Sequence, residues 1–181
     1  VKDYLPVSQV TNYEFAVAVG TAVPVREFNH LLAWMRANPE KSSIGVPATG
    51  SLPHFFALML GEKTGVDAQV VGYKGSAPLA TDLIGGHVPL AVDTLDSLEP
   101  QHAGGRLRML AVSGERRSPG APDVPTFREI GIDLVATGWN TLFAPAAMPA
   151  DKIGLLSEAV ARAMSDQSVR ARFAAAKMEP V

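Results

Sequence analysis

Apolar residues along this chain form short runs that alternate with segments in which they recur at helical spacing. The runs are bounded by glycine, proline or polar residues, which is typical of buried strands. They predict strands at residues 15–20, 43–47, 68–73, 88–92, 107–112 and 134–144. The helical spacing predicts helices that include residues 25–35, 52–60, 80–84, 95–102, 151–165 and 168–177. Strands separated by helix-sized segments indicate βαβ units, so we expect an α/β fold with a largely parallel sheet flanked by helices.

The helix that begins near residue 52 is expected to bury one apolar face. The residues at helical spacing on that face are Leu52, Phe55, Phe56, Met59 and Leu60. Pro53 suits a first helical turn, and Ser51 or Thr49 can cap it.

Composition narrows the class of protein. A hydrophobic content of 47% and a charged content of 19% are typical of a globular chain. The net charge of −2 gives no reason to expect a nucleic acid or an anionic membrane surface as a partner. The absence of cysteine excludes disulfides and thiol catalysis. No signal peptide begins the sequence, and its start at Val1 suggests processing or trimming.

Three loops follow the carboxyl ends of predicted strands, where open α/β sheets bind ligands. They are Ala48–Ser51, Tyr73–Ser76 and the Asp93 position. Two helix starts without acidic residues, both with hydroxyl groups, suit a carboxylate or a similar small anion. Lys74 adds a positive charge, and Tyr73 offers a wall and a hydroxyl. The alternatives are ordinary capped helices, a solvated Lys74, and an Asp93 that caps the next helix.

Catalysis has weaker support in the sequence. Ser51 and His54 lie close together, but no Gly-x-Ser-x-Gly pattern surrounds the serine, and their spacing is more natural for a helix cap. The histidines lack metal-ligand spacing, so we expect no metal. The glycine-rich turn lacks the P-loop and dinucleotide patterns, and we expect no cofactor.

Several segments, taken in order, resemble a known family. They are Gly45–His54, Tyr73–Gly86, Leu110–Ser113, Arg117–Pro119, Asp123–Thr126 and Leu142–Pro145. Together they are similar to the signature segments of the Bug family, the TctC-like substrate-binding receptors of tripartite tricarboxylate transporters. The resemblance covers nearly the whole chain.

This resemblance implies a periplasmic solute-binding protein of the type II, Venus-flytrap kind, with no chemistry of its own. Such receptors capture small carboxylates (amino acids, di- and tricarboxylates or aromatic acids) and deliver them to membrane transporter subunits. Carried over by motif, the ligand-binding residues would be Ala48, Thr49, Gly50, Ser51, His54, Tyr73, Lys74, Gly75 and Asp93. The family more often has glycine at position 48 and Asp-Asn-Leu at 93–95, so ligand choice is open there.

The resemblance also implies a domain organisation. Residues 1–137 would be the second ligand-binding lobe with an incoming crossover strand, and residues 138–181 the returning strand and C-terminal helices of an incomplete first lobe. The strands near Val7–Gly20 and Leu134–Ala144 would pass between the lobes. Apolar surface left exposed on the truncated first lobe would favour a homodimer.

Two other functions remain open at this stage. The first is a hydrolase or transferase that acts on an activated acid through Ser51 and His54. The second is a truncated lobe that serves as an oligomeric scaffold or sensor module.

Overall fold

A computed structural model describes residues 2–176 and 178–181. The expected end of the last helix at Lys177 lies outside the described residues. The strands are β1 (Tyr4–Gly20), β2 (Ser43–Val46), β3 (Gln69–Gly72), β4 (Leu90–Thr94), β5 (Leu107–Val112), β6 (Thr137–Pro145) and β7 (Glu179–Pro180). The helices are α1 (Phe28–Ala37), α2 (Leu52–Thr64), α3 (Ser76–Gly85), α4 (Leu95–Ala103), α5 (Ala150–Ser165) and α6 (Gln167–Ala175), with a short 3-10 helix, η1 (Pro39–Lys41).

The chain divides into two compact units. Residues 14–137 form one, called here the main unit, and residues 1–13 with 138–181 form the other, called the terminal unit. The chain passes from one unit to the other at residues 13–14, inside β1, and at residues 137–138, at the start of β6. The assignment of these parts to the two lobes of a receptor stays a prediction.

The main unit is built on a mixed sheet in the order β3-β2-β4-β1-β5. Strand β2 is parallel to both β3 and β4. Strand β1 is antiparallel to its neighbours β4 and β5, so β4 and β5 point the same way. Every strand of this sheet except β1 therefore shares one direction, and the predicted α/β fold with a largely parallel sheet is confirmed.

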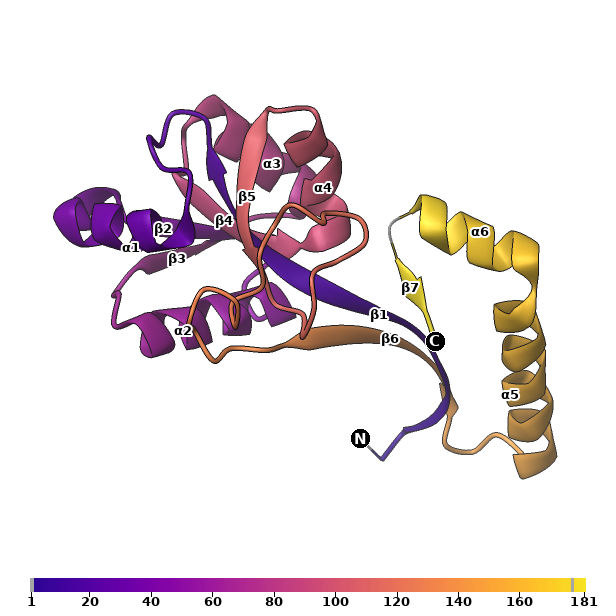
Figure 1. The fold of residues 1–181 in the computed structure, drawn as a ribbon. Helices are drawn as coiled ribbons and strands as arrows, with labels where there is room; N and C mark the ends of the chain where they lie inside the picture. The colour runs from indigo at the N-terminus through magenta and orange to yellow at the C-terminus, as the bar shows by residue number, and fades with distance from the viewer. Residues whose placement is uncertain (1, 177) are drawn as a thin grey trace. The chain divides into compact units, whose positions relative to one another are not determined.

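Helices cover both faces of this sheet, which explains why residues 15–20 of β1 are continuously apolar and buried. Ala16 and Ala18 pack in one core cluster with Leu79 of α3. Phe15, on the opposite face, contacts Phe56 of α2 with a ring-centroid distance of 5.3 Å. Figure 1 shows α2 on one side of the sheet and α3 and α4 on the other.

The face that α2 buries differs from the expected one. Phe56 and Leu60 are buried as expected, but Leu52, Phe55 and Met59 are about half exposed, at 46%, 52% and 44%. The buried face consists of Pro53, Phe56, Ala57 and Leu60. Leu52, Phe55 and Met59 recur at i, i+3 and i+7, and so do Pro53, Phe56 and Leu60. The two sets are offset by one residue, which is a rotation of about 100° on the helix, so apolar spacing alone does not choose between them.

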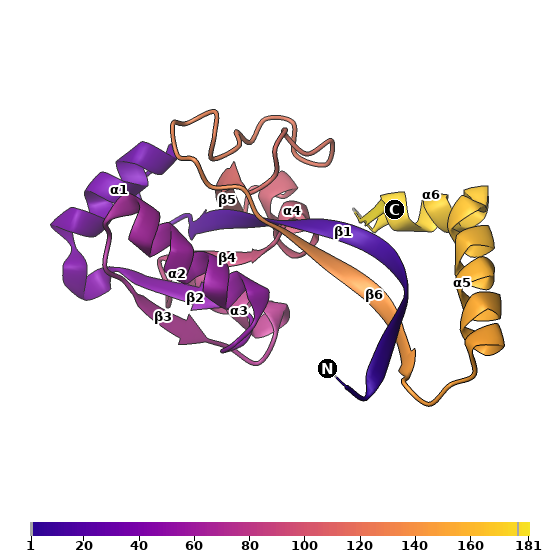
Figure 2. The ribbon, with the colours of Figure 1, turned by 90° about the horizontal axis from the view of Figure 1, so that it is seen from below.

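The terminal unit contains the first part of β1, which pairs with both β6 and β7, and the helices α5 and α6. Figure 2 shows β1 and β6 running side by side. Among the described residues of this unit, the only apolar side chains that are buried are Ala144 and Met164. The terminal unit therefore has a far smaller core than the main unit. No helix in the described part of the chain is long and apolar enough to cross a membrane.

Candidate functional site

The start of α2 is organised by hydrogen bonds among residues 48–54. The Ser51 hydroxyl donates to the Ala48 carbonyl at 2.7 Å and accepts the His54 backbone N–H at 3.3 Å, so Ser51 is the N-cap. Nδ1 of the His54 ring accepts the N–H of Gly50 at 2.8 Å. A neutral His54 therefore carries its proton on Nε2, where it can donate to a ligand. Gly50 has a φ of 79°, which favours glycine.

The start of α3 lacks a side-chain cap. Its N-cap residue is Gly75, with a φ of 112°, which has no side chain that could bond to the N–H groups of the first turn. The first turns of α2 and α3 contain no acidic residue. Neither first turn therefore supplies a carboxylate of its own to offset the partial positive charge of the helix N-terminus. The Lys74 side chain beside Gly75 is exposed.

Backbone hydrogen bonds hold these two helix starts side by side. The Tyr73 N–H donates to the Val46 carbonyl at 2.9 Å, and the Gly75 N–H donates to the Pro47 carbonyl at 2.8 Å. Thr49 packs directly on Gly72, where a Cβ atom would overlap its hydroxyl. The loops that follow β2 and β3 therefore form one continuous surface of the main unit.

Asp93 lies beneath this surface rather than on it. Its side chain is buried, and its Oδ1 accepts the Thr94 N–H at 2.7 Å. Burial raises the pKa of Asp93 above its ordinary value, hydrogen bonds from Ser76 and Thr94 oppose this shift, and the nearby Asp96 charge adds to it. Because Ser76 is the first residue of α3, Asp93 fixes the first turn of that helix from below. The N-cap of α4 is Thr94, so Asp93 does not hold that position.

The Tyr73 hydroxyl is directed at α3. It donates to Oδ2 of Asp82 at 3.0 Å, and the ring packs against the core cluster on that side of the sheet. Burial, the hydrogen bond to Asp82 and the charge of Asp82 all raise the pKa of Tyr73. Tyr73 therefore contributes a rigid wall to the loop, and its hydroxyl is already used by Asp82.

Ser51 and His54 are not arranged as a nucleophile and its base. The serine proton goes to the Ala48 carbonyl, and the histidine nitrogen that faces the loop is occupied by Gly50. In a nucleophile–base pair the imidazole would accept the hydroxyl proton. Across residues 2–176 and 178–181, no group of three or more His, Cys, Asp or Glu side chains is placed to hold a metal ion.

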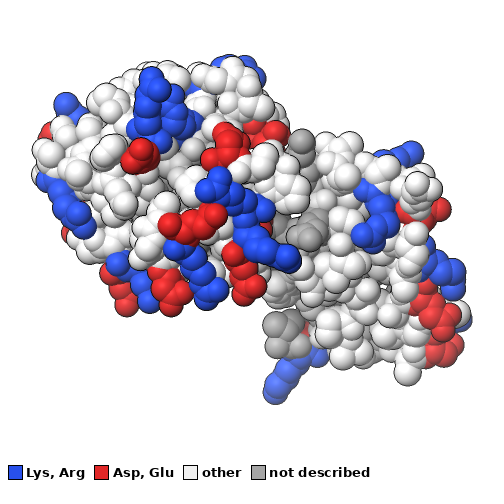
Figure 3. Space-filling model, in the orientation of Figure 1, with Lys and Arg blue, Asp and Glu red and all other residues white. Residues whose placement is uncertain are grey.

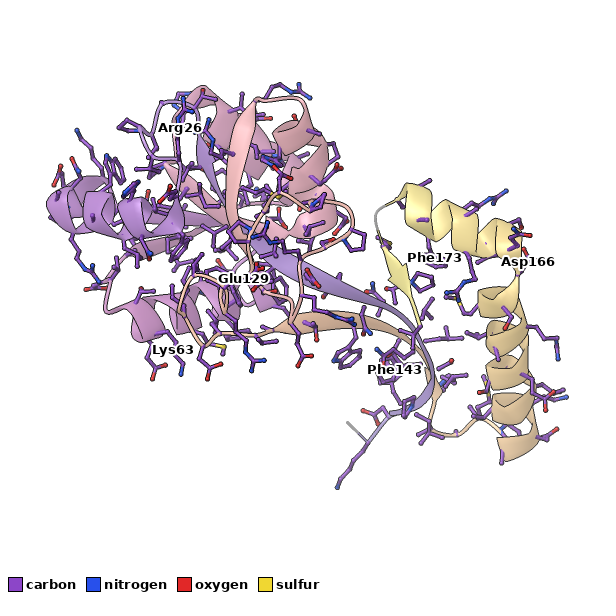
Figure 4. The ribbon with its side chains drawn as sticks, in the orientation of Figure 1. Arg26, Lys63, Glu129, Phe143, Asp166 and Phe173 are labelled. Atoms are coloured by element: carbon purple, nitrogen blue, oxygen red, sulfur yellow. The ribbon has the colours of Figure 1, made fainter. Side chains whose placement is uncertain are left out.

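A separate cavity of about 420 Å³ lies in the main unit away from these loops. Arg26 and Arg108 line it, but so do Glu27 and Asp123, and His102 bonds to Asp123 at 3.2 Å. Figure 4 labels Arg26 before α1, and Figure 3 shows acidic atoms beside basic ones over this part of the surface. The balanced charges favour neither an anion nor a cation. The sequence did not point to this cavity, because its lining comes from separate segments.

Comparison with known proteins decides the family. A model of the tripartite tricarboxylate transporter family receptor, TctC, matches residues 1–181. The chain belongs to this family. Protein BugT of Bordetella pertussis is 29% identical over 181 residues, which cover 99% of this chain and 56% of BugT. The chain spans about half the length of the curated relatives it matches.

Solved structures of TctC relatives have the same fold. A protein described as a periplasmic transporter is 33% identical, with a TM-score of 0.92, and the match covers 100% of this chain and 61% of that one. Rpa4515 of R. palustris, solved with adipate, is 30% identical with a TM-score of 0.92, covering 99% of this chain and 60% of that protein. The expected resemblance to TctC and Bug receptors is confirmed, and these relatives are receptors rather than enzymes.

The structure places all the predicted ligand-binding residues in the main unit, at the ends of β2, β3 and β4. Ala48, Thr49 and Gly50 are exposed, Ser51 and His54 are partly buried, and Asp93 lies beneath the surface. The bond between Asp93 and Ser76 was not predicted. The only signal for it was a hydroxyl residue at the start of a helix. Whether these residues contact a ligand stays a prediction.

Proposed function

We propose that this chain is the ligand-binding part of a periplasmic receptor that captures a small carboxylate and presents it to membrane transporter subunits. The carboxylate binds at the adjoining starts of α2 and α3. The N–H groups of Leu52, Ser76 and Ala77 and the Nε2–H of His54 supply the donors, because those of Gly50 and the His54 backbone are used within the loop. Lys74 adds a positive charge. The expected homodimer stays a prediction.

One observation carries this proposal: two helix N-termini whose first turns contain no acidic residue are held side by side. Their loops are joined by the bonds from Tyr73 to Val46 and from Gly75 to Pro47. Neither first turn contains an acidic residue, and the carboxyl of Asp93 at the start of α3 is buried and bonded to the Ser76 side chain. Two such termini attract an anion through fixed N–H dipoles and need no arginine. The binding of adipate by a TctC relative of 30% identity agrees with a carboxylate ligand.

A charge placed in the first turn of α2 tests the proposal. Leu52 is the first residue of α2 and is 46% exposed, so Leu52→Glu adds a carboxylate at the proposed anion seat without disturbing the core. The new charge repels a carboxylate ligand, and we expect affinity to fall by about tenfold or more. The matched control is Leu58→Glu, an equally exposed position farther along the same helix.

The measurement is amide NMR on this 19.1 kDa chain during titration with adipate, citrate and benzoate. We expect shifts that saturate and are confined to residues 49–54 and 74–77, that weaken in Leu52→Glu and persist in Leu58→Glu. Shifts centred on other residues, or equal losses in both variants, would contradict the proposal.

A further inference from the structure

Ser113, at the end of β5, is bonded to both segments that lead toward the terminal unit. Its side-chain oxygen accepts the Phe15 N–H at 2.8 Å and donates its proton to the Ala136 carbonyl at 2.6 Å. Its backbone N–H donates to the Phe15 carbonyl at 2.9 Å, and its carbonyl accepts the Ala136 N–H at 3.0 Å. Ser113 is fully buried, so water does not compete for these bonds.

These bonds lie at the boundary between the two units. Phe15 lies one residue inside the main unit on the incoming strand, and Ala136 lies one residue inside it on the outgoing segment. Ser113 thus uses every polar group it has to hold both connections at the boundary. The next residue is Gly114, where a Cβ atom would overlap the Glu14 carboxylate, so the Glu14 side chain of the incoming strand lies directly on the Gly114 backbone.

The terminal unit holds the same two strands on its own side of the boundary. Nδ2 of Asn140 donates to the buried Thr11 hydroxyl at 2.8 Å. The ring of Tyr13 lies on Gly138, where a side chain would overlap it. Within each unit, therefore, the two connections are tied to one another, and only the few residues between these ties are left to change their backbone angles.

We infer that Ser113 is a clamp that confines bending between the two units to residues 13–14 and 137–138. Loss of the Ser113 hydroxyl removes two of its four bonds to the connections and leaves the two backbone ones. With residues 15 and 136 held less tightly, bending spreads beyond residues 13–14 and 137–138, and the units then sample a wider range of orientations. Its importance for capturing a carboxylate rests on the proposed function, but the clamp itself does not.

The test compares Ser113→Ala with Ser42→Ala. Ser42 is also buried, and its hydroxyl lies 2.9 Å from the Met35 carbonyl and 2.8 Å from the Asn38 carbonyl, all inside the main unit. Both variants lose a buried hydroxyl, so both should have a lower Tm. Only Ser113→Ala removes bonds to the two connections.

The readout is the distribution of distances between the units, measured by pulsed electron spin resonance without any ligand. The chain has no cysteine, so Lys63→Cys on α2 and Arg162→Cys on α5 accept spin labels without interference. We expect a broader distribution in Ser113→Ala than in the unsubstituted protein, and an unchanged one in Ser42→Ala. Unchanged widths in both variants, or equal broadening in both, overturn the inference.

If Ser113→Ala does not fold, amide hydrogen exchange of the unsubstituted protein tests whether Ser113 acts as a clamp. The amides of Phe15, Ser113 and Ala136 should exchange with solvent deuterium only on global unfolding, as central core amides do. Exchange of these amides through local opening at the boundary would overturn the inference. Because neither measurement uses a carboxylate, their outcome is independent of whether the proposed ligand is correct.

Discussion

Asp93 is a buried acidic residue that positions part of the proposed anion-binding site. Its carboxyl group holds Ser76 and the start of α3, yet it lies beneath the surface on which the N–H groups are presented. Burial favours its neutral form, which reduces the repulsion that an ionised carboxylate would exert on a bound anion. The residue therefore contributes by positioning the helix start.

The raised pKa of Asp93 predicts a pH-dependent stability. The folded state retains the Asp93 proton at pH values where the unfolded chain has released it. The stabilisation is complete below the unfolded pKa and is lost as pH rises through the raised folded pKa, by about 1.4 kcal/mol for each pH unit that separates the two pKa values. We expect the free energy of unfolding of the native protein, relative to Asp93→Asn, to fall as pH rises from about 4 to about 8.

Urea unfolding of both proteins across this range provides the measurement, because groups other than Asp93 contribute equally to both. A difference that is independent of pH, or that grows as pH rises, would show that Asp93 has no raised pKa.

The sequence predicted the two loops at this site because their signals are local. Ser51 precedes a proline-started helix, and Gly75 lies where a turn requires a positive φ. The partners of Asp93 and Ser113 depend on contacts with residues far along the chain, such as Phe15 and Ser113, which are 98 positions apart. No local pattern encodes such a pair, so the sequence did not indicate either one.

At the scale of an element, α2 shows the limit of periodicity. The helix was predicted correctly, but its buried face was only partly right, because Phe56 and Leu60 are buried whereas Leu52, Phe55 and Met59 are exposed. Phe56 packs between Phe15 and Phe127, with ring centroids 5.3 and 5.6 Å away, whereas the Phe55 ring stacks on His54 near the surface. The aromatic cluster beneath the helix determines which face is buried.

Neighbouring phenylalanines in α2 give a matched test of this orientation. Phe56→Ala removes a side chain that is 2% exposed and should reduce the free energy of unfolding by about 3–5 kcal/mol. Phe55→Ala removes one that is 52% exposed and should change it by about 0.5 kcal/mol or less. Chemical denaturation measures both values, and a larger loss in Phe55→Ala would contradict the structure.

For the whole molecule, the two units differ in the core that supports their helices. Leu155 of α5 and Phe55 of α2 are exposed to a similar degree, at 55% and 52%. Behind α2 lies the packed sheet of the main unit, whereas Met164 is the only described residue of α5 whose side chain is buried. Exposure alone does not therefore predict how easily each helix opens.

Native-state proteolysis with chymotrypsin tests this difference, because cleavage inside a helix requires the helix to unfold locally. We expect the first cuts near Leu155 and Leu156 of α5, and much later cuts in α2. Mass spectrometry of the fragments over time identifies the order. Earlier cleavage in α2, or equal rates at both helices, would show that the terminal unit is as stable as the main one.

The placement of the terminal unit at both ends of the chain has a consequence for synthesis on the ribosome. Residues 14–137 emerge as one continuous stretch and have their whole sheet before β6 is made. The first part of β1 must wait for β6 and β7, which emerge more than a hundred residues later. Because such distant pairings form slowly, this segment of β1 waits longer for its partners than the strands of the main unit do, and it needs protection from aggregation during that time.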